Sequence, residues 1–236
     1  MNMFHWLGAG LVAASLVGCS LQSGDNVSTS PAPESKKDLS GTSVATFAGG
    51  CFWCVEADFE KVPGVVAAIS GYSGGTEPDP SYSEVASGRT GHVEAVRVHY
   101  DPTVITYEGL LQAFWRMVDP TDAGGQFSDR GKQYATAIFY HDDDQRRIAE
   151  RSLAELADTG RYDEPLVTPI QPAMTFYTAE DYHQDYYRRN SLRYGFYRRG
   201  SGRDRYLDDV WGDDLTVDFG RYSPPSKQAS SQAGER

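Results

Sequence analysis

The stretch GGCFWCVE, residues 49–56, constrains this chain more than any other. It holds two of the three cysteines in 236 residues, Cys51 and Cys54, with two large aromatic residues between them. The apolar run 44–48 predicts a strand, and apolar residues at helical spacing over 55–62 predict a helix. We therefore expect Cys51 at a strand-to-helix turn, where the positive end of the helix dipole favours a thiolate and so a sulfur nucleophile.

Downstream of this stretch, strand and helix patterns alternate through one continuous unit. The patterns predict strands at 65–72, 92–100 and 134–140, helices at 107–118, 142–158 and 179–189, a helical turn at 81–87, a glycine-bearing loop at 124–132 and an extended segment at 167–176. No internal repeat is visible. We expect one domain over 43–222, in which 190–222 is irregular chain wrapped on the surface, and a disordered polar tail over 223–236.

The composition limits the classes of partner. A net charge of −11 argues against nucleic acid and other polyanions. The 15 Tyr, 10 Phe and 4 Trp indicate an aromatic core or pocket. Three cysteines are too few for a disulfide scaffold.

The first 18 residues resemble a bacterial lipoprotein signal peptide. The apolar run 4–17 is short for a membrane span, and Gly18 precedes Cys19, although residues 1–6 contain no Lys or Arg. The resemblance implies cleavage before Cys19 and a lipid on its sulfur; the alternative is an apolar helix with a buried cysteine. Residues 19–42 read as a flexible tether. We therefore expect a lipid anchor in the cell envelope, with the domain facing the periplasm or the exterior.

A Cys-x-x-Cys pair alone leaves several chemistries open: disulfide exchange, zinc binding and haem attachment. Haem attachment needs His directly after the second cysteine, and Val55 stands there. A zinc site needs further soft ligands at paired spacing, whereas the domain has no other cysteine and its histidines are scattered. Two inert thiols one helical turn apart would be prone to oxidise in an oxidising compartment.

A set of short blocks resembles the peptide methionine sulfoxide reductase A family. The signature GCFW at 50–53, followed by Val55 and Glu56, carries the resemblance. Further blocks follow in order: GYSGG at 71–75, PSY at 80–82, TGHVEAV at 90–96, YDP at 100–102, FW at 114–115, DPT at 119–121, DRGKQY at 129–134 and AEDYHQ at 179–184. Any one block would be weak, but together they cover roughly 44–188.

The resemblance implies an α/β (α+β) fold, a two-layer sandwich of a mixed, mostly antiparallel sheet with flanking helices, a ferredoxin-like core and an irregular C-terminal segment. It also implies reduction of peptide-bound and free methionine-S-sulfoxide to methionine, which repairs oxidised proteins. Oxidised methionine-containing proteins and a thioredoxin-like reductant are the implied partners. No cofactor or metal is implied, and we expect a monomer.

The chemistry needs a thiolate and a proton donor at the sulfoxide oxygen. By resemblance, Cys51 is the nucleophile, Glu94 the donor, and Tyr82 and Tyr134 the hydroxyls that bind the oxygen. A carboxylic acid donates near neutral pH only if burial raises its pKa. Glu94 stands in the alternating strand 92–100, where an inward position would bury it; without the aligned blocks, a solvent-facing glutamate is the alternative.

The substrate must also be held by its methyl thioether. Phe52 and Trp53 resemble the family's methyl pocket, since an aromatic wall excludes water and attracts sulfur. Packing at the start of a helix is the alternative for both. Asp129 matches a family residue near the substrate, or else forms a loop turn. Glu180 and His183 belong to a block to which we assign a structural role.

Cys54 stands where the familiar family motif has glycine. After Cys51 attacks, a sulfenic acid remains, and a nearby second thiol converts it to a disulfide. Many relatives carry resolving cysteines near their C-terminus, and this chain has no cysteine after Cys54. With Cys19 lipidated, Cys54 is the resolving thiol, and an external dithiol must reduce the Cys51–Cys54 disulfide.

Two other functions remain to be distinguished from reduction of methionine sulfoxide. A general disulfide oxidoreductase would use the same pair of cysteines, but Phe52 and Trp53 are bulky for a motif open to protein disulfides. A non-catalytic module could bind a methionine-bearing or metal ligand, and the combination of Glu94 with two tyrosines argues against it.

Overall fold

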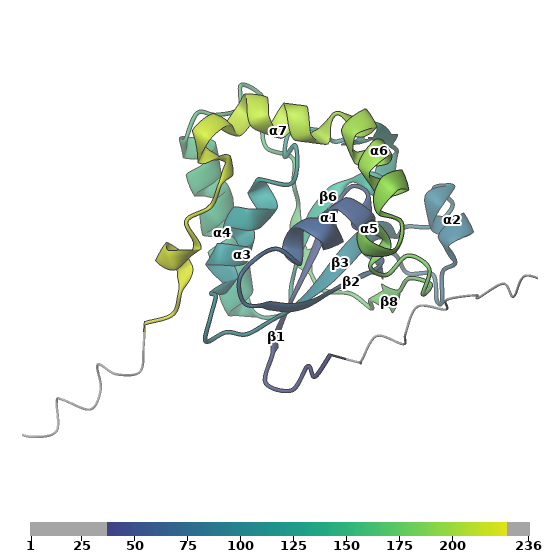
Figure 1. Ribbon diagram of the computed structural model, residues 1–236, viewed down its shortest axis with the longest axis horizontal. Coiled ribbons are helices and arrows are strands. Elements are labelled where there is room, and N and C mark those ends of the chain that lie inside the picture. Colours follow the sequence, from purple (N-terminus) through teal and green to yellow (C-terminus); the bar gives the residue numbers. More distant parts are fainter. Residues whose placement is uncertain (1–36, 226–236) are drawn as a thin grey trace, which may run out of the picture. The chain divides into compact units, whose positions relative to one another are not determined.

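The computed structural model describes residues 37–225. The predicted signal peptide, the predicted lipidation site Cys19, most of the predicted tether and residues 226–236 of the predicted tail lie outside the described residues. Within residues 37–225, β1 (Ser43–Gly49), β2 (Val65–Ser73), β3 (Val93–Tyr100), β6 (Thr136–Tyr140), β7 (Ile170–Pro172) and β8 (Tyr177–Thr178) form one sheet in the order β7-β6-β1-β3-β2-β8 (Figure 1).

The sheet is mixed and mostly antiparallel, as predicted. Only the pairing of β6 with β7 is parallel among the described strands. The inner four strands run β6-β1-β3-β2, and with α1 (Phe52–Phe59) and α3 (Tyr107–Trp115) they form the predicted ferredoxin-like core. A separate hairpin joins β4 (Gly125–Gln126) to β5 (Asp129–Arg130) and is followed by a 3₁₀ turn, η1 (Lys132–Tyr134).

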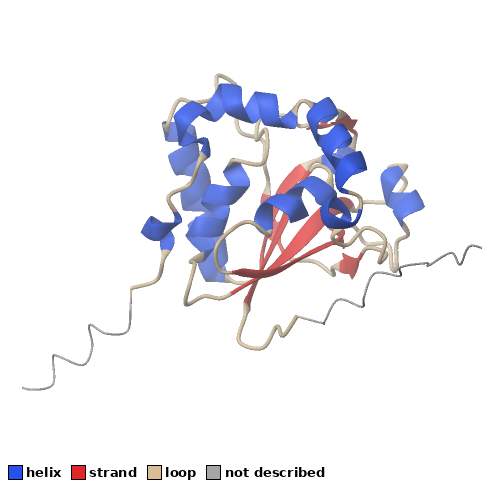
Figure 2. Cartoon of the chain, viewed as in Figure 1, coloured by secondary structure: helices blue, strands red, loops and turns tan. Residues whose placement is uncertain are grey.

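Helices cover one face of the sheet (Figure 2). Contacts join α1 to β2 and β3, α3 to β1, and α4 (Asp143–Asp158) to β6. The remaining helices are α2 (Tyr82–Ala86), α5 (Tyr186–Arg189), α6 (Ser191–Ser201) and α7 (Arg203–Trp211), and the 3₁₀ turns η2 (Gly212–Leu215) and η3 (Phe219–Tyr222) end the described chain.

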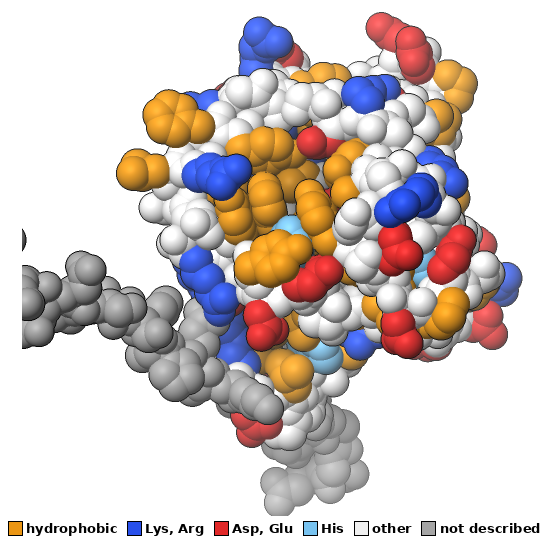
Figure 3. All heavy atoms as spheres, turned by 90° about the vertical axis from the view of Figure 1, so that its right-hand side faces the viewer, with side chains coloured by type: hydrophobic (Ala, Val, Ile, Leu, Met, Phe, Trp, Pro, Cys, Tyr) orange, Lys and Arg blue, Asp and Glu red, His pale blue; other side chains and the backbone are white. Residues whose placement is uncertain are grey.

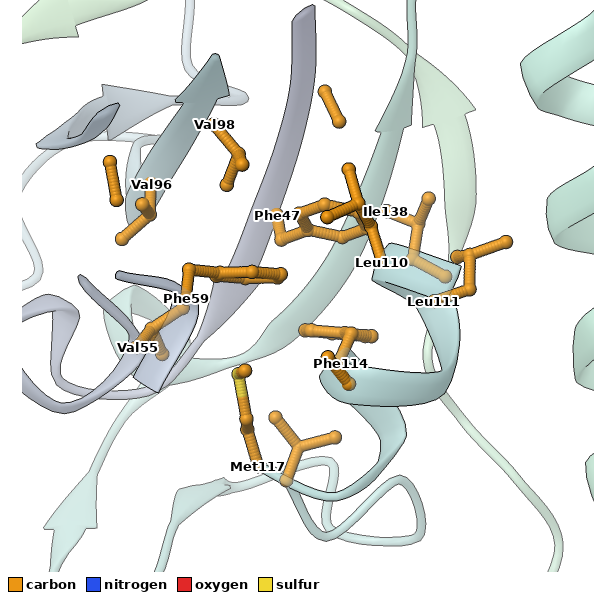
Figure 4. Close-up of a cluster of buried hydrophobic side chains, with 14 of the residues drawn as sticks. Phe47, Val55, Phe59, Val96, Val98, Leu110, Leu111, Phe114, Met117 and Ile138 are labelled. Carbon is orange, nitrogen blue, oxygen red and sulfur yellow. The ribbon is translucent and has the colours of Figure 1, made fainter. Parts of the chain in front are cut away.

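The main core lies between the sheet and these helices, with aromatic rings at its centre (Figure 4). The ring of Phe47 on β1 stacks on Phe59 of α1 at 4.9 Å and on Phe114 of α3 at 5.0 Å between centroids. On β3, Val96 and Val98 belong to the same core. Successive strand residues point to opposite faces, so Glu94 shares the helix-covered face with these two valines.

Two predictions about the C-terminal third are wrong. The segment 179–189 is not a continuous helix, because Asp185 adopts a left-handed backbone (φ 53°) and only α5 follows it. The side chain of Gln184 instead bonds the backbone of Ser70 on β2. Nor is 190–222 irregular, since it forms α6 and α7. Gly195 and Gly200 weaken the helical pattern by about 1 kcal/mol each relative to alanine, and packing on the domain overrides that preference.

Candidate active site

The turn before α1 fixes the position of Cys51. Gly50 adopts φ +79°, a conformation that side chains rarely tolerate, and a Cβ there would lie 2.5 Å from the Cβ of the buried Gln126. Cys51 then occupies the N-cap position of α1. The two glycines thus let the chain turn tightly beneath the hairpin and place Cys51 at the helix N-terminus, as predicted.

A cavity of about 80 Å³ gathers the predicted site residues. Its lining comes from α1, α2, β3, the β4–β5 hairpin, η1 and α6, and comprises Cys51, Phe52, Trp53, Tyr82, Glu94, Asp129, Tyr134 and Tyr197. Seven of these eight were singled out from the sequence, and Tyr197 was not. On the face that carries α2, α5 and α6, hydrophobic side chains gather in a hollow with acidic side chains at its edge (Figure 3).

Glu94 is a buried carboxyl group next to the thiol. Its side chain is 2% exposed, and its Oε2 accepts a hydrogen bond from the backbone N–H of Phe52 at 2.9 Å. Burial raises the pKa of Glu94 to about 8, and the nearby Asp129 contributes in the same direction. Glu94 is therefore mostly protonated at neutral pH and has a proton to donate into the cavity.

Two phenol groups face the same cavity. Burial, with the neighbouring Glu94, raises the pKa of Tyr82 to about 12. Burial and Glu94 also raise the pKa of Tyr134. Both hydroxyls stay protonated at neutral pH and can donate hydrogen bonds to an oxygen bound beside Glu94.

The aromatic wall is fixed by a residue far away in the sequence. The indole N–H of Trp53 donates to Nδ1 of His183 at 3.1 Å, and its ring stacks on Tyr186 with centroids 3.8 Å apart. The His183 ring also contacts Phe52, at 5.0 Å between centroids. Burial lowers the pKa of His183, so the imidazole is neutral and its Nδ1 is free to accept. His183 therefore orients the two side chains predicted to hold the substrate.

Replacing His183 with phenylalanine should raise KM for the sulfoxide about tenfold, the effect expected when a buried N–H loses its acceptor. His183→Gln keeps an acceptor for the Trp53 indole and should recover most of the affinity. Steady-state kinetics with N-acetyl-methionine sulfoxide and dithiothreitol would measure both variants against His99→Phe, a control on β3 away from the cavity. An unchanged KM in His183→Phe would show that the indole needs no fixed partner.

The thiols of Cys51 and Cys54 each affect the pKa of the other. Cys51 is 6% exposed and Cys54 is 0% exposed, and both are reduced in this structure. Burial raises the pKa of Cys51, whereas a hydrogen bond from Cys51, helped by the guanidinium groups of Arg203 and Arg198, lowers the pKa of Cys54 to about 7. The pKa of Cys54 therefore lies below that of Cys51, whereas the helix dipole led us to expect the lowered thiol pKa on Cys51. Cys54 can take the proton from Cys51 when Cys51 attacks.

Tyr197 is the cavity residue that the sequence reasoning missed. Its hydroxyl donates a hydrogen bond to Oδ2 of Asp129, and its proximity to Cys51 opposes the rise in the pKa of that thiol. Its ring packs edge-on against Trp53 at 5.9 Å. The spacing of Tyr194, Tyr197 and Arg198 is helical and could have revealed α6, but the glycines in the same segment obscured it.

Within residues 37–225, no group of three or more His, Cys, Asp or Glu side chains is placed to hold a metal ion. Likewise, among residues 37–225 no helix has the length and apolar character needed to span a bilayer.

Comparisons with known proteins agree with this site. The model of the family described as peptide methionine sulfoxide reductase matches residues 43–215. The chain is 52% identical over 169 residues to peptide methionine sulfoxide reductase MsrA of Bacillus licheniformis, a match that covers 72% of this chain and 93% of that protein. It is also 52% identical over 170 residues to MsrA/MsrB of Vibrio cholerae, covering 72% of this chain but 45% of the relative, so it spans less than half of that protein.

A solved structure of a similar protein has a similar fold. The crystal structure of Mxr1 from Saccharomyces cerevisiae in reduced form superposes with a TM-score of 0.61 at 34% identity, covering 66% of this chain and 90% of that one. The family match extends over well more than half of the sequence and includes every residue that lines the cavity. This chain belongs to the peptide methionine sulfoxide reductase family.

Proposed function

We propose that this oxidoreductase reduces methionine-S-sulfoxide, peptide-bound and to some extent free, to methionine, and so repairs oxidised proteins. The observation that carries the proposal is a buried Glu94 carboxyl group, whose pKa burial raises to about 8, in one aromatic-walled cavity with the thiol of Cys51. Exposed apolar side chains on α6, Leu192 and Phe196, stand on the helix that brings Tyr197 to the cavity, and they suit peptide substrates with apolar flanks.

The first step transfers oxygen from the substrate to the enzyme. The S-methyl group packs against Phe52 and Trp53, and the sulfoxide oxygen accepts hydrogen bonds from Glu94, Tyr82 and Tyr134. Protonation of this oxygen makes the substrate sulfur electrophilic, and the sulfur of Cys51 attacks it. Methionine leaves, and Cys51 is left as a sulfenic acid.

The second step forms a disulfide within α1. The thiol of Cys54 attacks the Cys51 sulfenic acid, the S–O bond breaks, and water leaves with the formation of a Cys51–Cys54 bond. The two residues stand three positions apart at the first turn of the helix, within reach of each other. A thioredoxin-like dithiol then reduces the disulfide and regenerates both thiols.

Replacing Cys54 with serine tests this cycle directly. The variant should release about one methionine per protein molecule and then stop when thioredoxin is the reductant, because no resolving thiol remains. The measurement is quenched-flow or single-turnover analysis with dabsyl-methionine-S-sulfoxide, and the wild type serves as the control with many turnovers. Sustained turnover of Cys54→Ser with thioredoxin would remove Cys54 from the resolving role.

We also propose that residues 1–18 direct lipidation of Cys19 and that residues 19–42 tether a monomeric domain to the envelope membrane. The sequence pattern around Cys19 supports this. Mass spectrometry of the N-terminal peptide from membrane fractions, compared with Cys19→Ser, would test it: a diacylglyceryl mass on Cys19 is expected, and an unmodified, uncleaved N-terminus contradicts the proposal.

A further inference from the structure

The two sulfurs that would form the disulfide are not equally accessible. Cys51 lines the cavity and retains 6% exposure, while Cys54 is fully buried one helical turn behind it. A thiol of another protein that enters from solvent therefore meets Cys51 first. Access is one of the factors that decides which sulfur of a disulfide is attacked.

Two guanidinium groups lie close to Cys54. Nη1 of Arg198 lies 2.8 Å from Oδ2 of Asp58, the residue one helical turn after Cys54, and 3.0 Å from the hydroxyl of Tyr194. The Arg198 side chain is only 15% exposed. This salt bridge connects α6 to α1 directly below the resolving thiol.

Arg203 is a buried cation without a carboxylate partner within residues 37–225. It is 1% exposed, and its guanidinium donates to the backbone oxygens of Gly49, at 3.0 Å, and Met117. One of its nitrogens would lie 3.2 Å from a Cβ placed on Gly50, immediately before Cys51. Charge buried without a counterion is expensive, so a negative charge that forms nearby is favoured.

The groups around the two sulfurs shift their pKa values in opposite directions. The hydrogen bond from Cys51 is the main cause that lowers the pKa of Cys54; Arg203 and Arg198 lower it further, against burial and Asp58. Burial is the main cause that raises the pKa of Cys51; Cys54 and Glu94 add to it, and the Tyr197 hydroxyl opposes it. In thiol–disulfide exchange, the sulfur of lower pKa leaves faster. Access and charge thus favour the same outcome.

We propose that the recycling thiolate attacks the Cys51 sulfur of the Cys51–Cys54 disulfide, so that Cys54 leaves as a thiolate in the field of Arg198 and Arg203. The inference rests on the proposed function, which supplies the disulfide. The incoming thiolate forms a sulfur–sulfur bond to Cys51, and the Cys51–Cys54 bond gives its electron pair to Cys54. The second thiolate of the reductant then attacks its own mixed disulfide, releases the Cys51 thiolate and leaves the reductant oxidised by two electrons.

A trapped intermediate tests the inference. The protein is first oxidised with diamide, which makes the disulfide without sulfoxide turnover, and then mixed with a thioredoxin whose second active-site cysteine is replaced by serine. After alkylation of free thiols, tandem mass spectrometry locates the adduct and the alkyl group. We expect the adduct on Cys51 and the label on Cys54, by about tenfold or more over the reverse.

The outcomes separate the inference from the proposed function. An adduct mainly on Cys54 overturns the inference and leaves the proposed function standing. A disulfide that forms with diamide but not after treatment with methionine sulfoxide contradicts the proposed resolving step, while the position of the adduct still decides the inference.

Variants of the arginines test the leaving-group role separately. Arg198→Met should slow reduction of the disulfide by dithiothreitol about three- to tenfold, and Arg198→Lys should restore most of the rate. Arg199→Met, an exposed neighbour on the same helix, is the matched control. The pH profile of Cys54 alkylation should shift upward in Arg198→Met, a change that a merely structural role would not produce. Equal rates and profiles in the methionine and wild-type proteins would overturn the role of Arg198.

Discussion

Replacing Cys51 with serine should abolish reduction of methionine sulfoxide, a loss of about a thousandfold or more. A serine hydroxyl stays protonated at any pH the protein survives and cannot take oxygen from the sulfoxide sulfur. Cys54 cannot substitute, because it is fully buried behind Cys51 while Cys51 faces the cavity. The measurement is conversion of dabsyl-methionine-S-sulfoxide with dithiothreitol, followed by chromatography.

The control for this variant is Cys54→Ser, which removes the neighbouring thiol from the same helix and should still complete one turnover. Thermal unfolding should show little change in Cys51→Ser, since serine is close in size at a position that is 6% exposed. Activity that persists in a folded Cys51→Ser protein would mean that the nucleophile lies elsewhere, and the mechanism proposed for this cavity would be wrong.

The sequence predicted the part of the site that depends on local pattern. Alternation along β3 places Glu94 on the same face as Val96 and Val98, and two glycines before Cys51 predict a tight turn at a helix N-terminus. Each of these inferences requires only the spacing of neighbouring residues. The order of the inner strands and the ferredoxin-like core came instead from resemblance to a family, because pairing between distant strands leaves no local signal.

The part of the site that the sequence did not predict depends on tertiary contacts. Trp53 and His183 are 130 positions apart, and the hydrogen bond between them cannot be inferred from either neighbourhood. Tyr197 and Arg203 lie in the segment 190–222, whose glycines suggested irregular chain. Burial of Arg203 is also unexpected from sequence, because arginine is almost never fully buried unless paired; here two backbone oxygens accept from it.

The sequence also did not predict which of the two thiols has the lower pKa. A helix N-terminus is a feature of the local sequence, and it led us to assign the thiolate to Cys51. The hydrogen bond from Cys51 is the main cause that lowers the pKa of Cys54, and the guanidiniums of Arg203 on α7 and Arg198 on α6 lower it further. The proposed nucleophile and the thiol of lower pKa are therefore different residues. In the proposed cycle Cys54 acts first as proton acceptor and later as leaving group.

Replacing Glu94 with glutamine should lower kcat/KM about a hundredfold to a thousandfold, the contribution of a well-placed general acid. Glutamine keeps the shape of the side chain, and its amide oxygen can still accept from the backbone N–H of Phe52, which Glu94 Oε2 binds at 2.9 Å. The amide cannot transfer a proton to the sulfoxide oxygen, although Tyr82 and Tyr134 can still bind it. Steady-state kinetics of the two proteins at pH 6 to 9 would measure the loss.

The activity of the wild type should also depend on pH in a direction that Glu94 determines. Burial raises the pKa of Glu94 from its ordinary value of 4.5 to about 8, so the wild-type donor is protonated below pH 8 and is lost above it. The rate contributed by the donor should fall as pH rises through about 8, and this fall should be missing from Glu94→Gln. Tyr82, whose pKa is about 12, does not titrate in this range. An identical fall in both proteins would assign the titration to another group.

The Glu94→Gln substitution should raise the stability of the protein at pH 7, although it lowers the activity. A carboxyl whose pKa is raised by folding stabilises the fold fully only below its unfolded pKa, and this stability is lost as pH rises from 4.5 through about 8. At pH 7 the rise of the Glu94 pKa on folding corresponds to a loss of about 3 kcal/mol in the free energy of unfolding. Glu94→Gln has no such titration, so its melting temperature should exceed that of the wild type at pH 7 and the gap should narrow toward pH 4.5. If Glu94 only supported the fold, its substitution would make the protein less stable. A Glu94→Gln protein that is more stable but less active would instead identify Glu94 as an acid that stays neutral for catalysis and lowers the stability of the fold.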